Sequence, residues 1–96
     1  MKINLTVIIK SKPEYREELK AILVDLTKNS KEEAACLQYD LHHNLQDPNV
    51  FILHEVWKNQ EGLVLHKEQS HFLKFNEASE LFLEEKITVF ETSRIG

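Results

Sequence analysis

Two strand-like segments near the middle of the chain, residues 37–45 and 50–57, are separated by only four residues, and this spacing strongly constrains the fold. The first segment alternates between apolar and polar residues, and the second is almost continuously apolar. Both patterns are typical of β-strands. The four residues between them, Gln-Asp-Pro-Asn at 46–49, are typical of a tight turn. The sequence therefore predicts an antiparallel hairpin over residues 37–57.

The first third of the chain predicts a strand followed by a helix. Residues 2–10 alternate, which indicates a strand, and Pro13 then stands where the first turn of a helix tolerates it. Apolar residues follow at helical spacing: Tyr15, Leu19, Ile22, Leu23 and Leu26. We expect an amphipathic helix of about four turns that ends at the polar run 27–33.

The last third predicts a pair of helices and a final strand. Asn59 suits the N-cap of a short helix, and Ser70 suits the N-cap of a second one. One side of the second helix carries Phe72, Phe75, Ser79, Phe82 and Leu83. Residues 87–92 alternate again, which indicates a fourth strand.

This order of elements is the ferredoxin-like βαββαβ pattern of the α+β class. It predicts a four-stranded antiparallel sheet with its helices on one face. The chain has 96 residues, which is enough for one core, so we expect residues 1–96 to form a single domain.

Composition excludes several classes of partner. The formal net charge is -4, and acidic and basic residues alternate, so neither nucleic acid nor an anionic membrane is an expected partner. The chain has a single cysteine, Cys36, so no disulfide can form within it. We expect the Cys36 side chain to be buried as a small hydrophobic group. The first ten residues, MKINLTVIIK, lack the features of a signal peptide, so we expect a cytoplasmic protein.

The segment 50–57 is apolar on both of its faces. One face carries Phe51, Leu53, Glu55 and Trp57, and the other carries Val50, Ile52, His54 and Val56. Helices on one side of a sheet can cover only one of these faces. We therefore expect a homodimer that packs through the open sheet face, although scattered exposed aliphatic residues are an alternative explanation.

Residues 54–72 bring unusual chemistry to one strand-to-helix corner, since they hold Glu55, Trp57, His66 and His71. An indole, one or two imidazoles and a carboxylate suit a pocket for a flat aromatic ligand, to which Asn4 can add an amide. Packing among further side chains sets the shape of this pocket: Leu5, Phe51, Leu53, Glu55, Phe72, Phe75 and Phe82.

Each of these residues also has a structural interpretation. A lone tryptophan such as Trp57 is more often a core residue than a ligand platform. His66 and His71 are five positions apart, which does not match the i, i+4 spacing of two metal ligands on one helix, so no metal site is predicted. The pair 32–33 (Glu-Glu) is expected to be a solvated turn.

The stretch from Cys36 to Phe72 resembles the antibiotic biosynthesis monooxygenase (ABM) family. The elements that carry the resemblance occur in order: Cys36, Tyr39-Asp40, Asp47-Pro48, Glu55-Val56-Trp57, and His66 through His71-Phe72. The resemblance implies a dimeric ferredoxin-like α+β barrel, in which each protomer carries a pocket between its sheet and its helices.

Members of this family include monooxygenases that oxidise aromatic polyketides or quinols with dioxygen and without a metal or flavin. The resemblance therefore implies a small aromatic or quinol-like substrate, no cofactor, and dioxygen as co-substrate. It suggests His66 as base or proton donor and His71 as second choice. Trp57 would stack against the substrate ring, and Asn4 would orient an oxygen atom.

Two departures and two alternatives qualify the resemblance. Ala35 stands where the family often has glycine, and Asn76 stands near the position where haem-degrading relatives carry an iron-binding histidine, which argues against haem. An isomerase of a small phosphorylated carbonyl compound is one alternative, with Lys67 and Lys74 available to bind phosphate. A non-catalytic binding module with structural histidines is the other.

Overall fold

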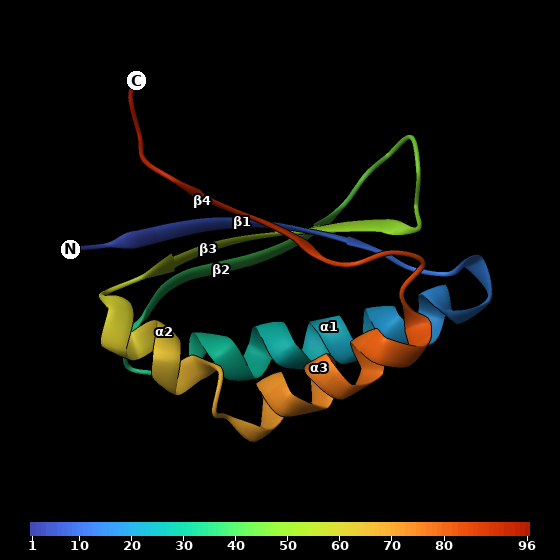
Figure 1. Ribbon diagram of the computed structural model, residues 1–96, viewed down its shortest axis with the longest axis horizontal. Coiled ribbons are helices and arrows are strands. Elements are labelled where there is room, and N and C mark those ends of the chain that lie inside the picture. The colour runs from blue at the N-terminus through green and yellow to red at the C-terminus, as the bar shows by residue number, and fades with distance from the viewer.

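The computed structural model describes all 96 residues, Met1–Gly96, and arranges them in two layers (Figure 1). One layer is a sheet and the other consists of helices packed on one of its faces. In chain order the elements are β1 (Ile3–Lys10), a 3-10 turn η1 (Pro13–Tyr15), α1 (Arg16–Lys31), β2 (Cys36–His43), β3 (Val50–Trp57), α2 (Gln60–His66), α3 (Ser70–Phe82) and β4 (Thr88–Thr92).

The four strands form one antiparallel sheet in the order β2-β3-β1-β4. The predicted ferredoxin-like α+β fold and the predicted hairpin are therefore confirmed. The sheet of the single chain is open, and it does not close into a barrel by itself. No helix combines the length and the apolar character that a membrane crossing requires.

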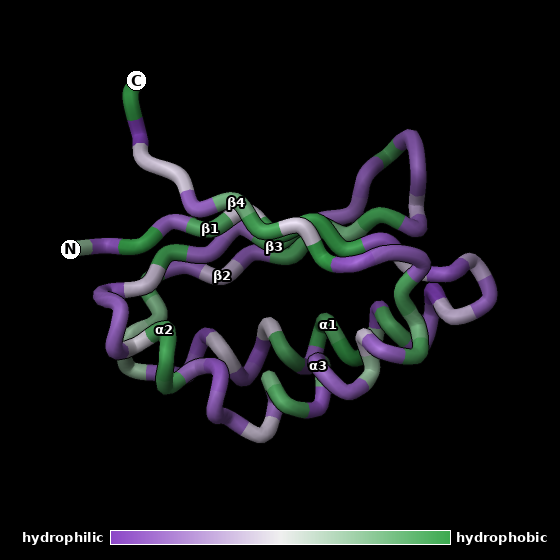
Figure 2. The backbone as a smooth tube through the Cα atoms, viewed as in Figure 1, coloured by the Kyte–Doolittle hydropathy of each residue, from purple (hydrophilic) through white to green (hydrophobic).

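The core lies between the sheet and α1, with α3 beside it. Alternate residues of β1 (Ile3, Val7 and Ile9) are buried against Leu19 and Leu23 of α1, as period-two and period-3.6 patterns require. Hydrophobic positions line both layers, whereas the loop that joins β2 to β3 is mostly hydrophilic (Figure 2). This core fixes the sheet and the helices as the two walls of any site between them.

Two predicted boundaries need correction. Helix α1 continues through the polar run to Lys31; within that run Ser30 is buried, Thr27 Oγ1 donates to the Leu23 carbonyl at 2.8 Å, and the Asn29 side chain donates to the Asp25 carbonyl. Strand β2 ends at His43 and leaves Leu45 in the loop, 86% exposed, because the Asn44 side chain accepts from the Gln46 amide and turns the chain.

One of the two predicted helix caps is confirmed and the other is wrong. Asn59 caps α2 as expected, since its Oδ1 accepts from the Gly62 amide at 2.8 Å. Ser70 is the first residue of α3 and not its cap; Gln69 holds the N-cap position and makes no side-chain capping bond. The Gln69 side chain instead donates to the Leu65 carbonyl of α2, which ties the two helices together.

Candidate active site

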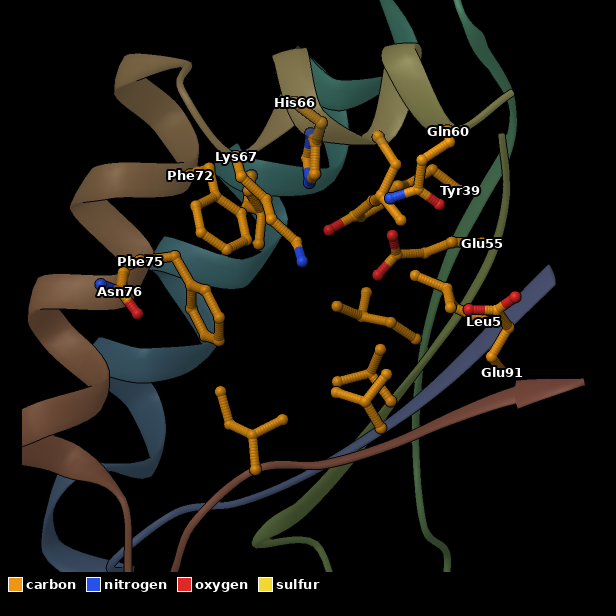
Figure 3. A pocket seen from close by; sticks show the side chains of 16 residues that line it. Leu5, Tyr39, Glu55, Gln60, His66, Lys67, Phe72, Phe75, Asn76 and Glu91 are labelled. Carbon is orange, nitrogen blue, oxygen red and sulfur yellow. The ribbon is translucent and has the colours of Figure 1, made fainter. Parts of the chain in front are cut away.

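A cavity of about 500 Å³ lies between the sheet and helices α2 and α3 (Figure 3). This volume is within the range of small-molecule sites. Phe72 and Phe75 of α3 form one wall, and Leu5, Val7 and Leu53 of the sheet form the other. Because 10 of its 16 lining residues are hydrophobic, the cavity suits a ligand with an apolar body.

Several polar side chains gather at one end of the cavity, whereas Asn76 of α3 lies apart from them (Figure 3). Tyr39 comes from β2, Glu55 from β3 and His66 from the end of α2, and Lys67 is the C-cap residue that follows α2. Tyr39 is buried, and this burial, aided by the charge of Glu55, raises the pKa of its hydroxyl above the usual range. Tyr39 therefore presents a neutral O–H donor at neutral pH.

Glu55 is a carboxyl group held in the sheet by the neighbouring indole. Trp57 Nε1 donates to Glu55 Oε1 at 2.8 Å, and the carboxyl group is directed into the cavity (Figure 3). Burial raises the pKa of Glu55, while the Trp57 bond and the Lys67 charge act in the opposite direction. The result is an acceptor, or a weak acid, at a fixed place in the cavity wall.

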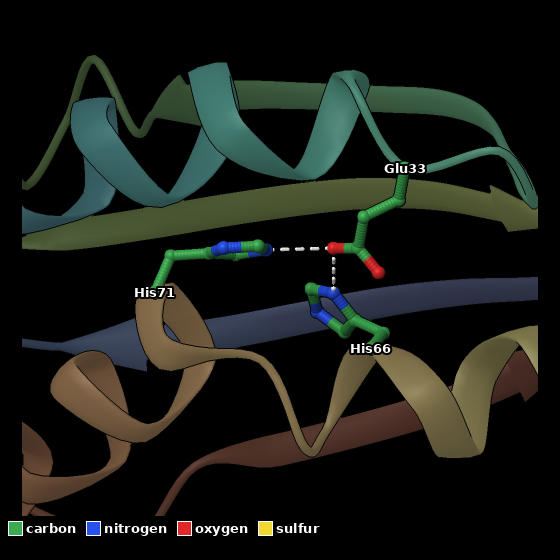
Figure 4. Close-up of side chains that lie close together, drawn as sticks. All are labelled: Glu33, His66 and His71. Carbon is green, nitrogen blue, oxygen red and sulfur yellow. Dashed lines mark hydrogen bonds and ion pairs between the residues drawn. The ribbon is translucent and has the colours of Figure 1, made fainter.

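His66 is held from behind by Glu33. One carboxylate oxygen, Glu33 Oε2, lies 2.7 Å from His66 Nδ1 and 2.7 Å from His71 Nε2 (Figure 4). We call these three residues the Glu33 clasp. An ionised carboxylate only accepts hydrogen bonds, so each of these two nitrogens carries a hydrogen. His66 Nε2 is then left as an unprotonated acceptor on a ring that lines the cavity.

The His66 imidazole is fixed by aromatic neighbours as well. Its ring centroid lies 4.4 Å from that of Trp57 and 5.1 Å from that of Phe72. Burial lowers the pKa of His66, and this effect outweighs the opposing influence of Glu33. At neutral pH the bond to Glu33 is therefore a hydrogen bond of a neutral imidazole rather than an ion pair.

The clasp forms because α2 packs closely on the loop before β2. Gly62 of α2 leaves no room for a side chain, since an added Cβ would lie 2.3 Å from the Ala35 Cβ. The Lys58 amide also donates to the Ala35 carbonyl at 2.8 Å. These two contacts bring the loop that carries Glu33 against the helix that carries His66.

Residues 3–78 match the family described as antibiotic biosynthesis monooxygenase. The chain belongs to this family. It is 37% identical over 73 residues to "Putative monooxygenase YcnE" of Bacillus subtilis, and the alignment covers 76% of this chain and 77% of YcnE. Membership of the ABM family and this relative support a monooxygenase-like function.

Two solved structures share the fold of the whole chain. PA3566 from Pseudomonas aeruginosa has a TM-score of 0.92 at 32% identity, covering 99% of this chain and 95% of that one. Rv0793 from Mycobacterium tuberculosis has the same TM-score of 0.92 at 19% identity, covering 100% and 97% of the two chains, and shows a shared fold alone.

The structure brings together six of the eleven residues predicted for the ABM site; Phe82, which stacks on Tyr15, is among those that do not line the cavity. His66, Leu5, Leu53, Glu55, Phe72 and Phe75 all line the cavity. Phe51 is buried at the other end of the sheet, close to Arg16 and His43. His71 lies on the far side of Glu33, so it supports His66 and does not line the cavity.

Two predicted placements are corrected. Asn4 pairs with Val56 in the sheet and does not line the cavity, because its parity in β1 is opposite to that of Leu5. Trp57 is fully buried beneath His66 and does not line the cavity either, so it is a core residue that supports the site.

Sequence reasoning missed Glu33, Tyr39 and the cavity-facing position of Lys67. Glu33 was expected in a solvated turn, yet its side chain is only 14% exposed and holds both histidines. Tyr39 shares the apolar face of its strand, so the alternation of β2 was a usable signal. No periodic pattern points to Glu33, since it lies in a loop between α1 and β2.

The spacing argument against a metal site does not apply to this geometry. His66 ends α2 and His71 lies in the first turn of α3, so the two imidazoles belong to different helices. Together with Glu33 they offer three ligand atoms within 4.8 Å of one another.

Proposed function

We propose that the protein is a monooxygenase that oxidises a small quinol or other dihydroxy-aromatic compound with dioxygen, without a metal or flavin cofactor. The observation that carries the proposal is the position of His66. Its Nδ1 is held by Glu33 at 2.7 Å, and its ring lines a mostly apolar cavity of about 500 Å³. Family membership and the relative YcnE support this class of reaction.

The first step is removal of a phenolic proton by His66 Nε2. Burial lowers the pKa of His66, so the imidazole is neutral and able to accept a proton at neutral pH. The Glu33 carboxylate then stabilises the imidazolium that forms, because it lies at hydrogen-bond distance from Nδ1.

The second step uses the electron-rich phenolate as reductant. It passes one electron to dioxygen, and the resulting radical and superoxide combine to form a carbon–oxygen bond. The peroxide takes the proton back from His66 and then loses water. One hydrogen of this water is the proton from His66, and the other is the ring hydrogen at the carbon that dioxygen attacked. One oxygen atom stays in the quinone product, the other leaves as water, and the substrate supplies both electrons.

The polar end of the cavity suits this sequence. The Tyr39 hydroxyl and the Lys67 ammonium are donors for the negative charge that develops on oxygen, and Glu55 can accept from a second substrate hydroxyl. On the opposite wall, Phe72 and Phe75 can pack against the apolar ring of the substrate and help to exclude water.

We also infer a homodimer through the open sheet face. Val50, Ile52 and Val56 of β3 lie there, half-buried, and Phe90 of β4 is 54% exposed. A second copy of the sheet is the cover that this apolar face fits best, and with it the two sheets form the expected dimeric barrel.

The alternative isomerase function has one supporting observation. Lys67 lines the cavity and can bind a phosphate group. The carboxyl groups of Glu55 and Glu91 line the same cavity and disfavour the double negative charge of a phosphate group, while Lys74 does not line it. The cavity therefore fits a neutral phenol better than a phosphorylated compound.

The test is oxygen consumption by the metal-stripped protein with a panel of hydroquinones. A sample without protein corrects for autoxidation, and His43→Gln, an exposed histidine outside the cavity, is the control variant. His66→Gln keeps a polar side chain of similar reach but provides no base, so turnover should fall at least about 100-fold. Labelled dioxygen should deliver one oxygen atom to the product.

Full turnover in His66→Gln would remove the assigned base. Absence of oxygen uptake across the panel would contradict the monooxygenase function. Tight binding of a phosphorylated sugar without oxygen uptake would then favour the isomerase, and binding of apolar ligands without chemistry would favour a binding module.

A further inference from the structure

We propose that the Glu33 clasp is a binding site for a divalent transition-metal ion such as Zn²⁺, and that metal binding there switches off His66 as a base. The first half of this inference stands on the geometry of Glu33, His66 and His71 alone. The second half rests on the proposed function, because it concerns the nitrogen that faces the cavity.

The three side chains converge from separate elements on one point (Figure 4). Glu33 Oε2 lies 2.7 Å from His66 Nδ1 and 2.7 Å from His71 Nε2, and all three ligand atoms lie within 4.8 Å of one another. Ligand atoms around Zn²⁺ are about 3–3.5 Å apart, because each bonds to the ion at about 2.0–2.2 Å. Occupation therefore requires the two imidazoles to approach one another while Glu33 stays close to its present place.

The parts of the clasp differ in how freely they can make this adjustment. His66 is only 2% exposed and is packed against Trp57 and Phe72, so its ring is fixed. His71 is 12% exposed and lies in the first turn of α3, where rotation about its side-chain bonds moves Nε2. The adjustment thus falls on His71, whose partial exposure gives an ion a path from solvent.

The donor set selects the class of ion. Two imidazole nitrogens and one carboxylate oxygen are ligands for Zn²⁺, Co²⁺, Ni²⁺ and Fe²⁺, whereas Ca²⁺ and Mg²⁺ prefer oxygen ligands throughout. Glu33 is 14% exposed, so water can complete the coordination shell.

Metal binding has a direct consequence for the cavity. In the metal-free protein the hydrogen of neutral His66 is on Nδ1, where it bonds to Glu33, and Nε2 is an acceptor. A metal on Nδ1 displaces that hydrogen, and a neutral imidazole then carries its hydrogen on Nε2. The nitrogen that faces the substrate changes from acceptor to donor, so it can no longer remove a phenolic proton.

The other close pair of histidines lacks this arrangement. His42 and His54 lie on the open face with ring centroids 5.5 Å apart, but no carboxylate bonds to either ring. His54 Nδ1 contacts only Thr6 Oγ1, at 3.4 Å. His42→Ala is therefore the matched control, because it removes one of two paired histidines and leaves the clasp intact.

The binding test is calorimetric titration of the metal-stripped protein with Zn²⁺, repeated with Co²⁺ to observe its visible absorption. We expect one site per chain in the wild type and in His42→Ala. Glu33→Gln and His71→Ala should each weaken binding at least tenfold and change the Co²⁺ spectrum. Equal Zn²⁺ affinity in the wild type and in Glu33→Gln would overturn the site.

Nitrogen-15 NMR of the imidazole rings tests the tautomer independently of activity. Metal-free His66 should carry its hydrogen on Nδ1, and the Zn²⁺ form should carry it on Nε2. A ring whose tautomer is unchanged by a stoichiometric amount of Zn²⁺ would overturn the switch. Where oxygen uptake is observed, Zn²⁺ should suppress it in the wild type and not in His71→Ala. If no uptake occurs, the proposed function fails, while the calorimetric titration and the NMR tautomer measurement still decide this inference.

Discussion

The molecule contains two close pairs of histidines that differ in almost everything except ring separation. The rings of His66 and His71 have centroids 5.9 Å apart, and those of His42 and His54 have centroids 5.5 Å apart. The first pair lies on the helix-covered side of the sheet with a carboxylate between its members. The second lies on the open face, where both side chains are exposed.

The comparison teaches that the surroundings give these histidines their chemistry. His66 is buried beside Trp57, its hydrogen is placed by Glu33, and one ring edge borders a cavity. Nothing comparable fixes His42 or His54. Proximity of two imidazoles is common to both pairs, so it cannot be the property that makes a site.

The largest expected effect concerns Trp57, which packs beneath His66 of the buried histidine pair. Trp57→Ala removes a fully buried indole that packs against His66, so the free energy of unfolding should fall by about 3–5 kcal/mol. His43→Ala, at an exposed position, should change it by no more than about 0.5 kcal/mol. Urea denaturation measures both values. Wild-type stability in Trp57→Ala, with loss of ligand binding, would restore Trp57 as the ligand platform.

The next effect concerns what covers the open-face pair. Ile52 lies opposite His42 in the sheet, so Ile52→Asp places a carboxylate in the middle of the proposed dimer interface. An unpaired buried charge costs several kcal/mol, and the dimer dissociation constant should rise at least about 100-fold. Analytical ultracentrifugation measures it.

The matched control for the dimer is Val24→Asp on α1, where Val24 is 53% exposed on the helical layer. This variant should sediment like the wild type. A wild-type protein that is monomeric at every concentration, or an Ile52→Asp variant with unchanged association, would show that the open face has no such partner.

A smaller effect on the kinetic constants distinguishes Glu33, beside His66 and His71, from Asp40, which lies opposite His54. Glu33→Gln keeps the size of the side chain but removes the charge that stabilises a protonated His66, so kcat should fall about tenfold. KM should change little, because Glu33 does not line the cavity. Asp40→Asn, opposite His54 on the open face, should leave both constants unchanged. Steady-state kinetics on an active quinol make the comparison, and a rise in KM alone would place Glu33 in substrate binding.

Much of the fold could be predicted because it follows from periodicity. Alternation in β1 and β3 and the hairpin between β2 and β3 are local patterns that burial enforces on a sheet covered on one side. Parity also contained information about the site. Asn4 and Leu5 are neighbours in β1, so their side chains point to opposite faces of the sheet. Leu5 lines the cavity and Asn4 does not, in contrast to the role that family resemblance suggested for Asn4.

The missing part of the site depends on contacts that no local pattern encodes. Glu33 reaches His66 because Gly62 lets α2 approach Ala35, a contact between segments far apart in the sequence. A single glycine inside a helix does indicate close packing, but it does not identify the partner. Tyr39 faces Glu55 only through the register of β2 on β3, which the alternation of one strand leaves open.

The smallest expected effect concerns Glu55, the buried carboxyl group of the cavity. Burial raises the pKa of Glu55 in the folded protein, so folding favours its protonated form. Below the unfolded-state pKa, about 4.3, the group is protonated in both states and folding bears no penalty. As the pH rises, the unfolded chain loses this proton first, and stability decreases until the pH passes the folded pKa.

Glu55→Gln cannot ionise, and its amide oxygen can still accept from Trp57 Nε1. The variant should therefore unfold at a slightly higher temperature than the wild type at neutral pH, and the difference should disappear near pH 4. Glu84→Gln, at an exposed position, controls for the change in net charge. Thermal unfolding at several pH values measures the difference, and a variant less stable than the wild type at neutral pH would mean that the ionised carboxylate stabilises the fold. Loss of turnover in the more stable variant would show that Glu55 is kept for binding the substrate hydroxyl at the expense of stability.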